Sequence, residues 1–200
     1  MAKHLSIKDE TSSSQFREDV LLWDSLRKGN EIGFSTLYKK YVQPLFNYGM
    51  HIHPNRDLIK DCIQELFIKI WEKRDSFGPI EKVNFYLFRS FKNLLFHKIE
   101  TSSKKHPLTQ DLIDQMSPDL PVENLYINSE MVDQRIIRLK KAVLLLTDRQ
   151  REVILLRFFQ GFEINEIAEI MNLSVPSVHN LFSLTIKSLR EKIKWNDLMP

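Results

Sequence analysis

The sequence predicts an all-α protein with two small helical domains joined by an acidic linker, the second domain carrying a helix-turn-helix. In both halves of the 200-residue chain, apolar residues recur every three or four positions, and no stretch alternates with the period of a strand. Residues 107–130 hold five acidic side chains, three prolines and no lysine or arginine. Near the C-terminus, Asn172-Leu173-Ser174 separates two amphipathic stretches, as in a helix-turn-helix.

Composition excludes several functional classes. Apolar residues make up 42% and charged residues 28%, a balance typical of a globular chain rather than a disordered one. The five glycines form no phosphate-binding loop, and the single cysteine excludes disulfide scaffolds and cysteine-based zinc sites. No apolar run would span a bilayer, and the N-terminus has no signal core. We therefore expect a cytoplasmic protein, and nucleotide-dependent enzymes are disfavoured.

The distribution of charge predicts the domain boundaries. Residues 1–106 carry 18 basic and 13 acidic side chains, and residues 131–200 carry 11 basic and 8 acidic ones. Both blocks are therefore mildly positive, whereas the segment between them is negative and its prolines oppose continuous helix. The sequence predicts a disordered segment over 1–19, a helical domain over 20–106, an acidic linker over 107–130 and a helix-turn-helix domain over 131–200.

The first domain begins with a buried helical stripe, in which apolar residues recur at three or four positions: Phe34, Leu37, Tyr41, Leu45 and Tyr48. Pro44 lies inside this pattern and is expected to kink or interrupt the helix. Asn55 is a suitable N-cap for a second helix over about 56–74, and Gly78-Pro79 ends that segment.

The helix over about 56–74 has two different faces. At 100° per residue, its core face consists of Ile59, Ile63, Leu66 and Ile70. The opposite face surrounds Ile68 with polar and aromatic side chains: Asp61, Gln64, Glu65, Trp71 and Glu72. Ile68 is either a single exposed apolar residue, which is common, or the centre of an acidic patch that docks on a basic partner.

A third helix, over about 83–100, combines cations with aromatic rings. Its basic residues, Arg89, Lys92 and Lys98, follow the segment Asn84-Phe85-Tyr86. Rings stack on unpaired bases while cations follow the phosphates, so this pattern suits single-stranded nucleic acid. The alternative is that Phe85 and Tyr86 are core residues.

The second domain has the local signals of a helix-turn-helix. Thr147 and Gln150 are spaced as a capping box for a helix that ends at Gly161. A short helix follows, in which Ala168 allows close packing. Asn172 suits a left-handed turn, and Ser174 caps the last helix, over about 175–194.

The last helix presents a polar outer face. Its buried stripe is Val178, Leu181, Phe182, Thr185, Leu189 and Ile193. The outer face consists of Ser177, His179, Asn180, Ser183, Leu184 and Lys187. Such side chains contact base edges and thymine methyl groups in a major groove, and Lys187, Arg190, Arg149 and Arg151 are candidates for phosphate contacts. The alternative is a helical core unit without a DNA partner. Because the face is poor in cations, we expect this block alone to bind DNA weakly.

Three segments together resemble bacterial RNA polymerase sigma factors of the extracytoplasmic-function (ECF) subfamily. LTDRQREVILLRFFQGFEINEIAEIMNLSVPSVHNLFSLTIKSLREKI (146–193) resembles sigma region four. DCIQELFIKIWEKRDSF (61–77) resembles the region-two helix with a D-x-x-Q-E-x-F-x-x-x-W pattern, and FYLFRSFKNLLFHKI (85–99) resembles the adjoining promoter-melting helix. The order and spacing of the three segments carry the resemblance, which covers nearly all of residues 20–194.

The resemblance implies a role for each segment. Asp61, Gln64, Glu65, Ile68 and Trp71 would bind core RNA polymerase. Asn84, Phe85, Tyr86, Arg89, Lys92 and Asn93 would capture the single-stranded −10 element. The helix from Ser174 to Arg190 would read the duplex −35 element of promoter DNA. The acidic linker would thread toward the polymerase active-site channel. An anti-sigma factor, in this subfamily frequently membrane-bound, is implied as a further partner. The resemblance implies a protein that is not an enzyme and binds no cofactor, metal or small-molecule substrate.

The chain departs from the family pattern at several positions. Tyr86 replaces a tryptophan of the melting helix, and Glu163 replaces the serine that commonly caps the first helix of the helix-turn-helix. In the last helix, His179, Leu181 and Thr185 stand where arginines are frequent. These differences concern the strength and identity of the promoter contacts.

Three other functions are compatible with parts of the pattern. The first is a free-standing helix-turn-helix transcriptional regulator that does not join polymerase. The second is an enzyme with a metal held by His51, His53 and Asp57, although histidines in a proline-containing turn are more often surface or capping residues. The third is a helical adaptor that has lost DNA binding.

Overall fold

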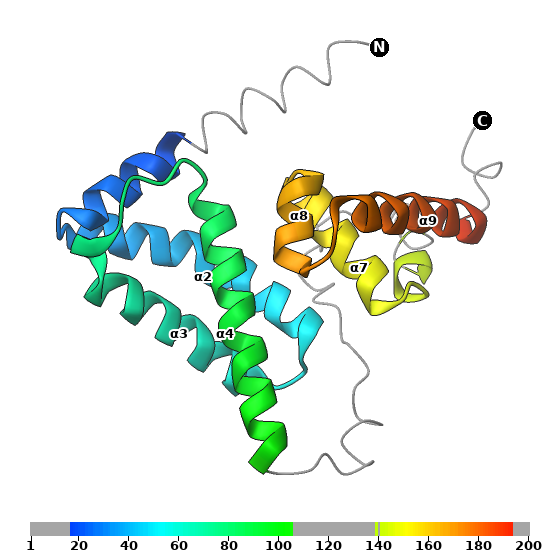
Figure 1. Ribbon diagram of the computed structural model, residues 1–200, viewed down its shortest axis with the longest axis horizontal. Helices are drawn as coiled ribbons and strands as arrows, with labels where there is room; N and C mark the ends of the chain where they lie inside the picture. Colours follow the sequence, from blue (N-terminus) through cyan, green and yellow to red (C-terminus); the bar gives the residue numbers. More distant parts are fainter. Residues whose placement is uncertain (1–16, 106–138, 140, 194–200) are drawn as a thin grey trace, which may run out of the picture. The chain divides into compact units, whose positions relative to one another are not determined.

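The computed structural model describes residues 17–105, 139 and 141–193, and every regular element among them is helical (Figure 1). These residues form two compact units, one of residues 17–49 and 55–105 and the other of residues 50–54, 139 and 141–193. The predicted all-α class with two helical domains is confirmed. The acidic linker over 107–130 lies outside the described residues. None of the described helices is both long enough and apolar enough to cross a membrane.

The first unit begins with a helical segment over residues 17–27, so the end of the segment predicted to be disordered, residues 17–19, is helical. Asp19 explains the difference, because its buried carboxylate accepts a hydrogen bond from the Tyr41 hydroxyl at 2.5 Å and pairs with Lys40 Nζ at 2.6 Å. Burial, followed by the hydrogen bond to Asp19, raises the pKa of Tyr41 above its usual range. The hydroxyl therefore stays protonated and continues to donate.

Helix α2 (Glu31–Ile52) continues through Pro44, where the sequence predicts a kink or an interruption. Proline removes one backbone hydrogen bond, but buried side chains lie on both sides of it, Tyr41 before and Leu45 and Tyr48 after. Tertiary packing of an apolar face supplies most of the stability of a protein helix, which accounts for the continuity.

Helix α3 (Arg56–Glu72) begins where the sequence predicts, because the Asn55 side chain accepts hydrogen bonds from the backbone N–H groups of Asp57 and Leu58. A short 3₁₀ turn, η1 (Arg74–Ser76), follows it. Helix α4 (Val83–Lys105) is longer at its C-terminal end than predicted. It is joined to α3 by an ion pair between Lys98 Nζ and a Glu65 oxygen, 2.7 Å apart.

Gly49 lies where α2 closely approaches α3 and α4. A Cβ atom at this position would lie 2.7 Å from Ile59 Cγ2 and 2.9 Å from Phe91 Cζ. We expect Gly49→Ala to lower the free energy of unfolding by about 1–3 kcal/mol, because overpacking outweighs the higher helix propensity of alanine. The measurement is urea denaturation followed by tryptophan fluorescence. Gly78→Ala is the control, since nothing lies within 4 Å of that position; an equal loss in both variants would contradict the steric explanation.

The second unit contains α7 (Asp148–Ile154), the π-helical turn η3 (Leu155–Phe159), α8 (Ile164–Met171) and α9 (Val175–Ile193) (Figure 1). The predicted capping box is present: the Thr147 hydroxyl accepts from the Gln150 N–H, and the Gln150 side chain accepts from the Thr147 N–H. The predicted stop at Gly161 is confirmed, because this residue has φ +74°. The core of the second unit includes Val153, Leu156, Phe162, Ile167 and Val178.

Candidate functional site

Helix α3 separates a buried face from an exposed one, as its sequence pattern predicts. The core face consists of Ile59, Cys62, Ile63, Leu66, Phe67 and Ile70. On the opposite face, Ile68 is 49% exposed and lies between the exposed side chains of Asp61, Gln64 and Glu72 along the helix. The structure therefore places an apolar side chain within a polar surface, where a partner can cover it.

Trp71 borders this surface and is held in place by its neighbours. Its ring centroid lies 5.0 Å from that of Phe34, and the Arg74 guanidinium lies 4.6 Å above the indole. Arg74 Nη1 also donates to the Trp71 carbonyl at 2.8 Å. The half-buried indole is therefore fixed by contacts on α2 and η1 before any partner binds.

Glu65 is tied to cations within its own unit. Its carboxylate pairs with Lys69 on α3 and with Lys98 on α4. The hydrogen bonds that Lys69 and Lys98 donate to the Glu65 carboxylate lower the pKa of Glu65, and the bond that Lys98 donates to Glu65 raises the pKa of Lys98. Glu65 therefore remains charged below the usual pH range of a glutamate, but part of its charge is already neutralised.

An aromatic cluster holds the start of α4. The ring centroid of Trp23 lies 5.4 Å from the centroids of both Phe77 and Tyr86, and the centroids of Phe77 and Tyr86 are 5.7 Å apart. Trp23 Nε1 donates to the Gly78 carbonyl at 3.3 Å, and Arg27 Nε donates to the Phe77 carbonyl at 2.7 Å. Tyr86 is half-buried here, and burial raises the pKa of its hydroxyl. The Tyr86 ring is therefore part of the packing around Trp23, which favours the core alternative for Tyr86.

The other predicted −10 contacts on α4 differ in exposure. Arg89 and Asn93 are exposed, and Phe85 is half-buried. The Cζ atom of the Arg89 guanidinium lies 5.9 Å from the centroid of the Phe85 ring. Asn84 and Lys92 are only 8% and 5% exposed, although the sequence predicts them as surface contacts. The helix turns both residues toward the interior, because they flank the fully buried side chains Leu87, Phe88, Phe91 and Leu95.

Sequence reasoning missed Phe96 on this face. Its side chain is 49% exposed, and the Lys92 ammonium lies 5.4 Å from its ring centroid. The available signal is spacing: Phe96 follows Phe85 by eleven residues, about three helical turns, which returns it to the same face of α4. The aromatic and cationic stripe on α4 therefore extends beyond the predicted −10 residues, as far as Phe96.

The helix-turn-helix adopts its predicted local geometry. Asn172 ends α8 in the left-handed region, with φ 52° and ψ 46°. The Ser174 hydroxyl accepts from the Ser177 N–H at 3.3 Å and caps α9. At the start of α8, the Glu166 side chain accepts from the Glu163 N–H at 2.8 Å, and the Glu163 carboxylate pairs with Arg157. The Glu166 carboxylate thus satisfies one terminal N–H at the start of α8, where Glu163 itself is a weaker cap than serine.

The outer face of α9 is open to solvent, and its exposed side chains are those predicted to contact DNA: Ser174, Ser177, His179, Asn180, Ser183, Leu184, Lys187 and Arg190. Leu184 is 51% exposed, so an apolar group lies beside hydrogen-bonding ones. Thr185 is buried and donates to the Leu181 carbonyl, so it faces the core as the sequence predicts. The arrangement suits direct readout of base edges.

The two arginines at the start of α7 have different environments. Arg149 is exposed, as a phosphate contact requires. Arg151 is only 9% exposed; its Nε and Nη2 donate to the Leu146 carbonyl, and Nη2 pairs with Asp148 at 3.0 Å. The predicted phosphate contact of Arg151 is therefore not supported, because its guanidinium is used to hold the start of the helix.

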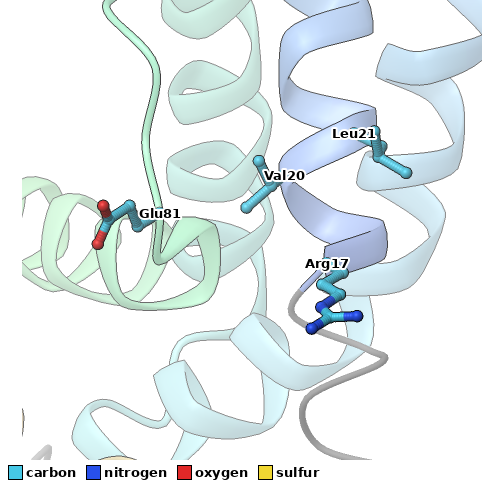
Figure 2. Close-up of a pocket in the computed structure, with 4 residues that line it drawn as sticks. All are labelled: Arg17, Val20, Leu21 and Glu81. Atoms are coloured by element: carbon cyan, nitrogen blue, oxygen red, sulfur yellow. The ribbon is translucent and has the colours of Figure 1, made fainter.

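Two features of the sequence that could carry chemistry, the His51, His53 and Asp57 cluster and Cys62, are not supported by the described residues, 17–105, 139 and 141–193. These residues contain no group of three histidine, cysteine or carboxylate side chains placed to hold a metal ion. Burial raises the pKa of the Cys62 thiol, which opposes thiolate formation. Figure 2 shows a surface hollow lined by Arg17, Val20 and Leu21 of the first helical segment and by Glu81, with side chains that do not converge on one point.

Comparison with known proteins gives matches over both units. The sigma-70 region 2 family model matches residues 37–104, and the sigma-70 region 4 model matches residues 136–189, together more than half of the chain. The ECF RNA polymerase sigma factor SigW of Bacillus subtilis (strain 168) is 24% identical over 182 residues, which cover 84% of this chain and 93% of SigW.

Two further similarities extend over most of the chain. The ECF RNA polymerase sigma-E factor of Escherichia coli (strain K12) is 24% identical over 191 residues, which cover 91% of this chain and 97% of that protein. Among solved structures, CnrH in complex with the cytosolic domain of CnrY matches with a TM-score of 0.56 and 20% identity, covering 88% of this chain and 97% of that one. This last similarity concerns the fold.

Proposed function

This chain belongs to the ECF family of RNA polymerase sigma factors, and from that membership we propose which partner each of its exposed surfaces binds during transcription initiation. The exposed face of α3 binds core RNA polymerase. The exposed face of α4 captures the unpaired −10 element, and the outer face of α9 reads the duplex −35 element. The observation that carries the proposal is the exposure of Ile68 within a polar helix face, in a chain whose other unit is a helix-turn-helix.

The α3 surface suits a partner that is basic and partly apolar. Ile68 supplies the apolar contact, Asp61 supplies negative charge, and the fixed Trp71 ring supplies a rigid border. Buried apolar and aromatic side chains at the centre of an interface contribute most of its binding energy, whereas charges at the rim set orientation and association rate. Ile68 is therefore the expected centre of the polymerase interface.

The DNA contacts are assigned to the exposed members of the predicted sets. On α4 these are Arg89, Asn93 and the half-buried Phe85, and on α9 they are the exposed polar residues together with Leu184. We assign no DNA contact to Asn84, Lys92 or Arg151, because their side chains are buried within their units. The chain performs no covalent chemistry in this proposal, since capture of unpaired bases is enough to stabilise opened DNA.

A titration with purified bacterial core RNA polymerase tests the proposal. The chain is labelled with a fluorophore at its N-terminus, and binding is measured by anisotropy. Saturable binding, followed by selection of a duplex sequence by the complex, is expected for a sigma factor. Selection of duplex DNA by the chain without any binding to polymerase would instead indicate the free-standing transcriptional regulator.

Lys187→Ala is expected to weaken promoter binding by the polymerase complex and to reduce the slope of log affinity against log salt concentration by about 1, because one phosphate contact is lost. Affinity is measured by filter binding between about 50 and 200 mM salt. Lys28→Ala, an exposed lysine of the first unit, is the matched control and should leave the slope unchanged. An unchanged slope for Lys187→Ala would show that this residue does not contact phosphate.

A further inference from the structure

A stripe of aromatic and polar residues follows one face of α4. Phe85, Arg89, Asn93 and Phe96 recur at intervals of three or four residues, so their side chains leave the helix in similar directions. The first three are among the predicted −10 contacts, and Phe96 extends the stripe toward the C-terminal end of the helix. At about 1.5 Å per residue, Phe96 lies about 16 Å along the helix axis from Phe85.

Phe96 differs from the other phenylalanines in the central part of α4. Phe88 and Phe91 are fully buried, whereas Phe96 is 49% exposed. Single exposed apolar residues are common and need no explanation by themselves. Here, however, Lys92 occupies a buried position one turn earlier and places its ammonium 5.4 Å from the ring centroid. The cation therefore supports one face of the ring while a large part of the side chain remains open to solvent.

We propose that Phe96 is a further promoter-contacting residue, which stacks on an unpaired base of the opened DNA. This inference rests on the proposed function and extends the −10 surface beyond the residues that the sequence predicts. Every base has a π-face, so an exposed ring on a nucleic-acid surface is a stacking platform that tolerates any sequence. Stacked nucleotides advance about 3.4 Å each, so the base on Phe96 lies about four or five nucleotides from one at Phe85.

The test uses the full chain assembled with core RNA polymerase. The DNA is a promoter selected by the unmodified complex from a randomised pool and then prepared with a preformed unpaired −10 segment. Stacking is worth about 1–3 kcal/mol per base, so Phe96→Leu should weaken binding to the unpaired segment about tenfold. Phe96→Trp retains a ring and should bind within about twofold of the unmodified complex. Binding of Phe96→Leu to a fully paired −35 duplex should not change.

An abasic scan of the unpaired segment distinguishes stacking from an indirect effect. If Phe96 stacks on one base, removal of that base should lower the affinity of the unmodified complex for the unpaired segment. The same removal should hardly change the affinity of the Phe96→Leu complex, because the stacking contact is already lost. Additive losses at every position would overturn the stacking role. If the Phe96→Leu complex bound the unpaired segment as tightly as the unmodified complex while Arg89→Ala lost affinity, the role of Phe96 would be overturned. The proposed −10 function of α4 would stand. Failure of the unmodified complex to bind any opened DNA would overturn the role of Phe96 together with the proposed −10 function.

Discussion

Ile68→Asp is expected to abolish binding of the chain to core RNA polymerase while the first unit keeps its fold. Ile68 is 49% exposed in the free chain, so an aspartate there is hydrated and costs little folding energy. In the complex the same carboxylate would be buried at the centre of the interface without a designed partner. Loss of a central apolar contact, together with burial of a charge, should lower the affinity more than about 100-fold. The measurement is the anisotropy titration with core polymerase.

Ile32→Asp provides the matched control for this substitution. Ile32 is 76% exposed and lies in the first turn of α2, outside the proposed polymerase surface. An acidic side chain in the first turn of a helix is favourable, so the control should fold normally and bind polymerase as the unmodified chain does. Normal assembly of Ile68→Asp would show that the α3 face is not the polymerase interface. Equal loss in both variants would point to a general effect of added negative charge.

Trp23→Ala is expected to lower the free energy of unfolding of the first unit by about 3–5 kcal/mol. The indole is fully buried, packs against Phe77 and Tyr86, and donates to the Gly78 carbonyl. Its removal leaves a cavity between the first helical segment and the residues that lead into α4. The measurement is urea denaturation followed by circular dichroism at 222 nm, a signal that does not depend on the deleted fluorophore.

Trp23→Phe separates the contribution of the ring from that of its hydrogen bond. It retains an aromatic side chain but removes the donor to the Gly78 carbonyl, so a smaller loss of about 1–2 kcal/mol is expected. If Trp23→Ala unfolded at the same urea concentration as the unmodified chain, the aromatic cluster would not stabilise the first unit. An effect in Trp23→Phe as large as that in Trp23→Ala would assign the stability to the hydrogen bond instead of the packing.

The fold class and the local boundaries could be predicted because they depend on residues close together in the chain. The capping box of Thr147 and Gln150 involves groups three residues apart, and the left-handed turn at Asn172 reflects the preference of a single side chain. Helical periodicity likewise places Ile68 opposite Ile63 and Leu66 without reference to any other element. These signals are strong because no distant contact competes with them.

Other features depend on contacts between distant elements. Pro44 is a local helix breaker, yet α2 continues through it because its apolar face is packed on both sides. Periodicity assigns residues to faces but does not say how deep a long side chain lies. The sequence therefore predicts Lys92 and Arg151 as surface cations, whereas the structure buries both.

The sequence by itself determined an all-helical chain with two helical domains, the helix-turn-helix and the family, because each follows from local spacing or from the order of motifs. Only the tertiary structure decided which members of the candidate surfaces are exposed. It placed Tyr86 in the packing around Trp23, held Trp71 against Phe34, and left Phe96 open to solvent. The physical reason is that the exposure of a side chain depends on which other elements cover it, and those elements are distant in the sequence.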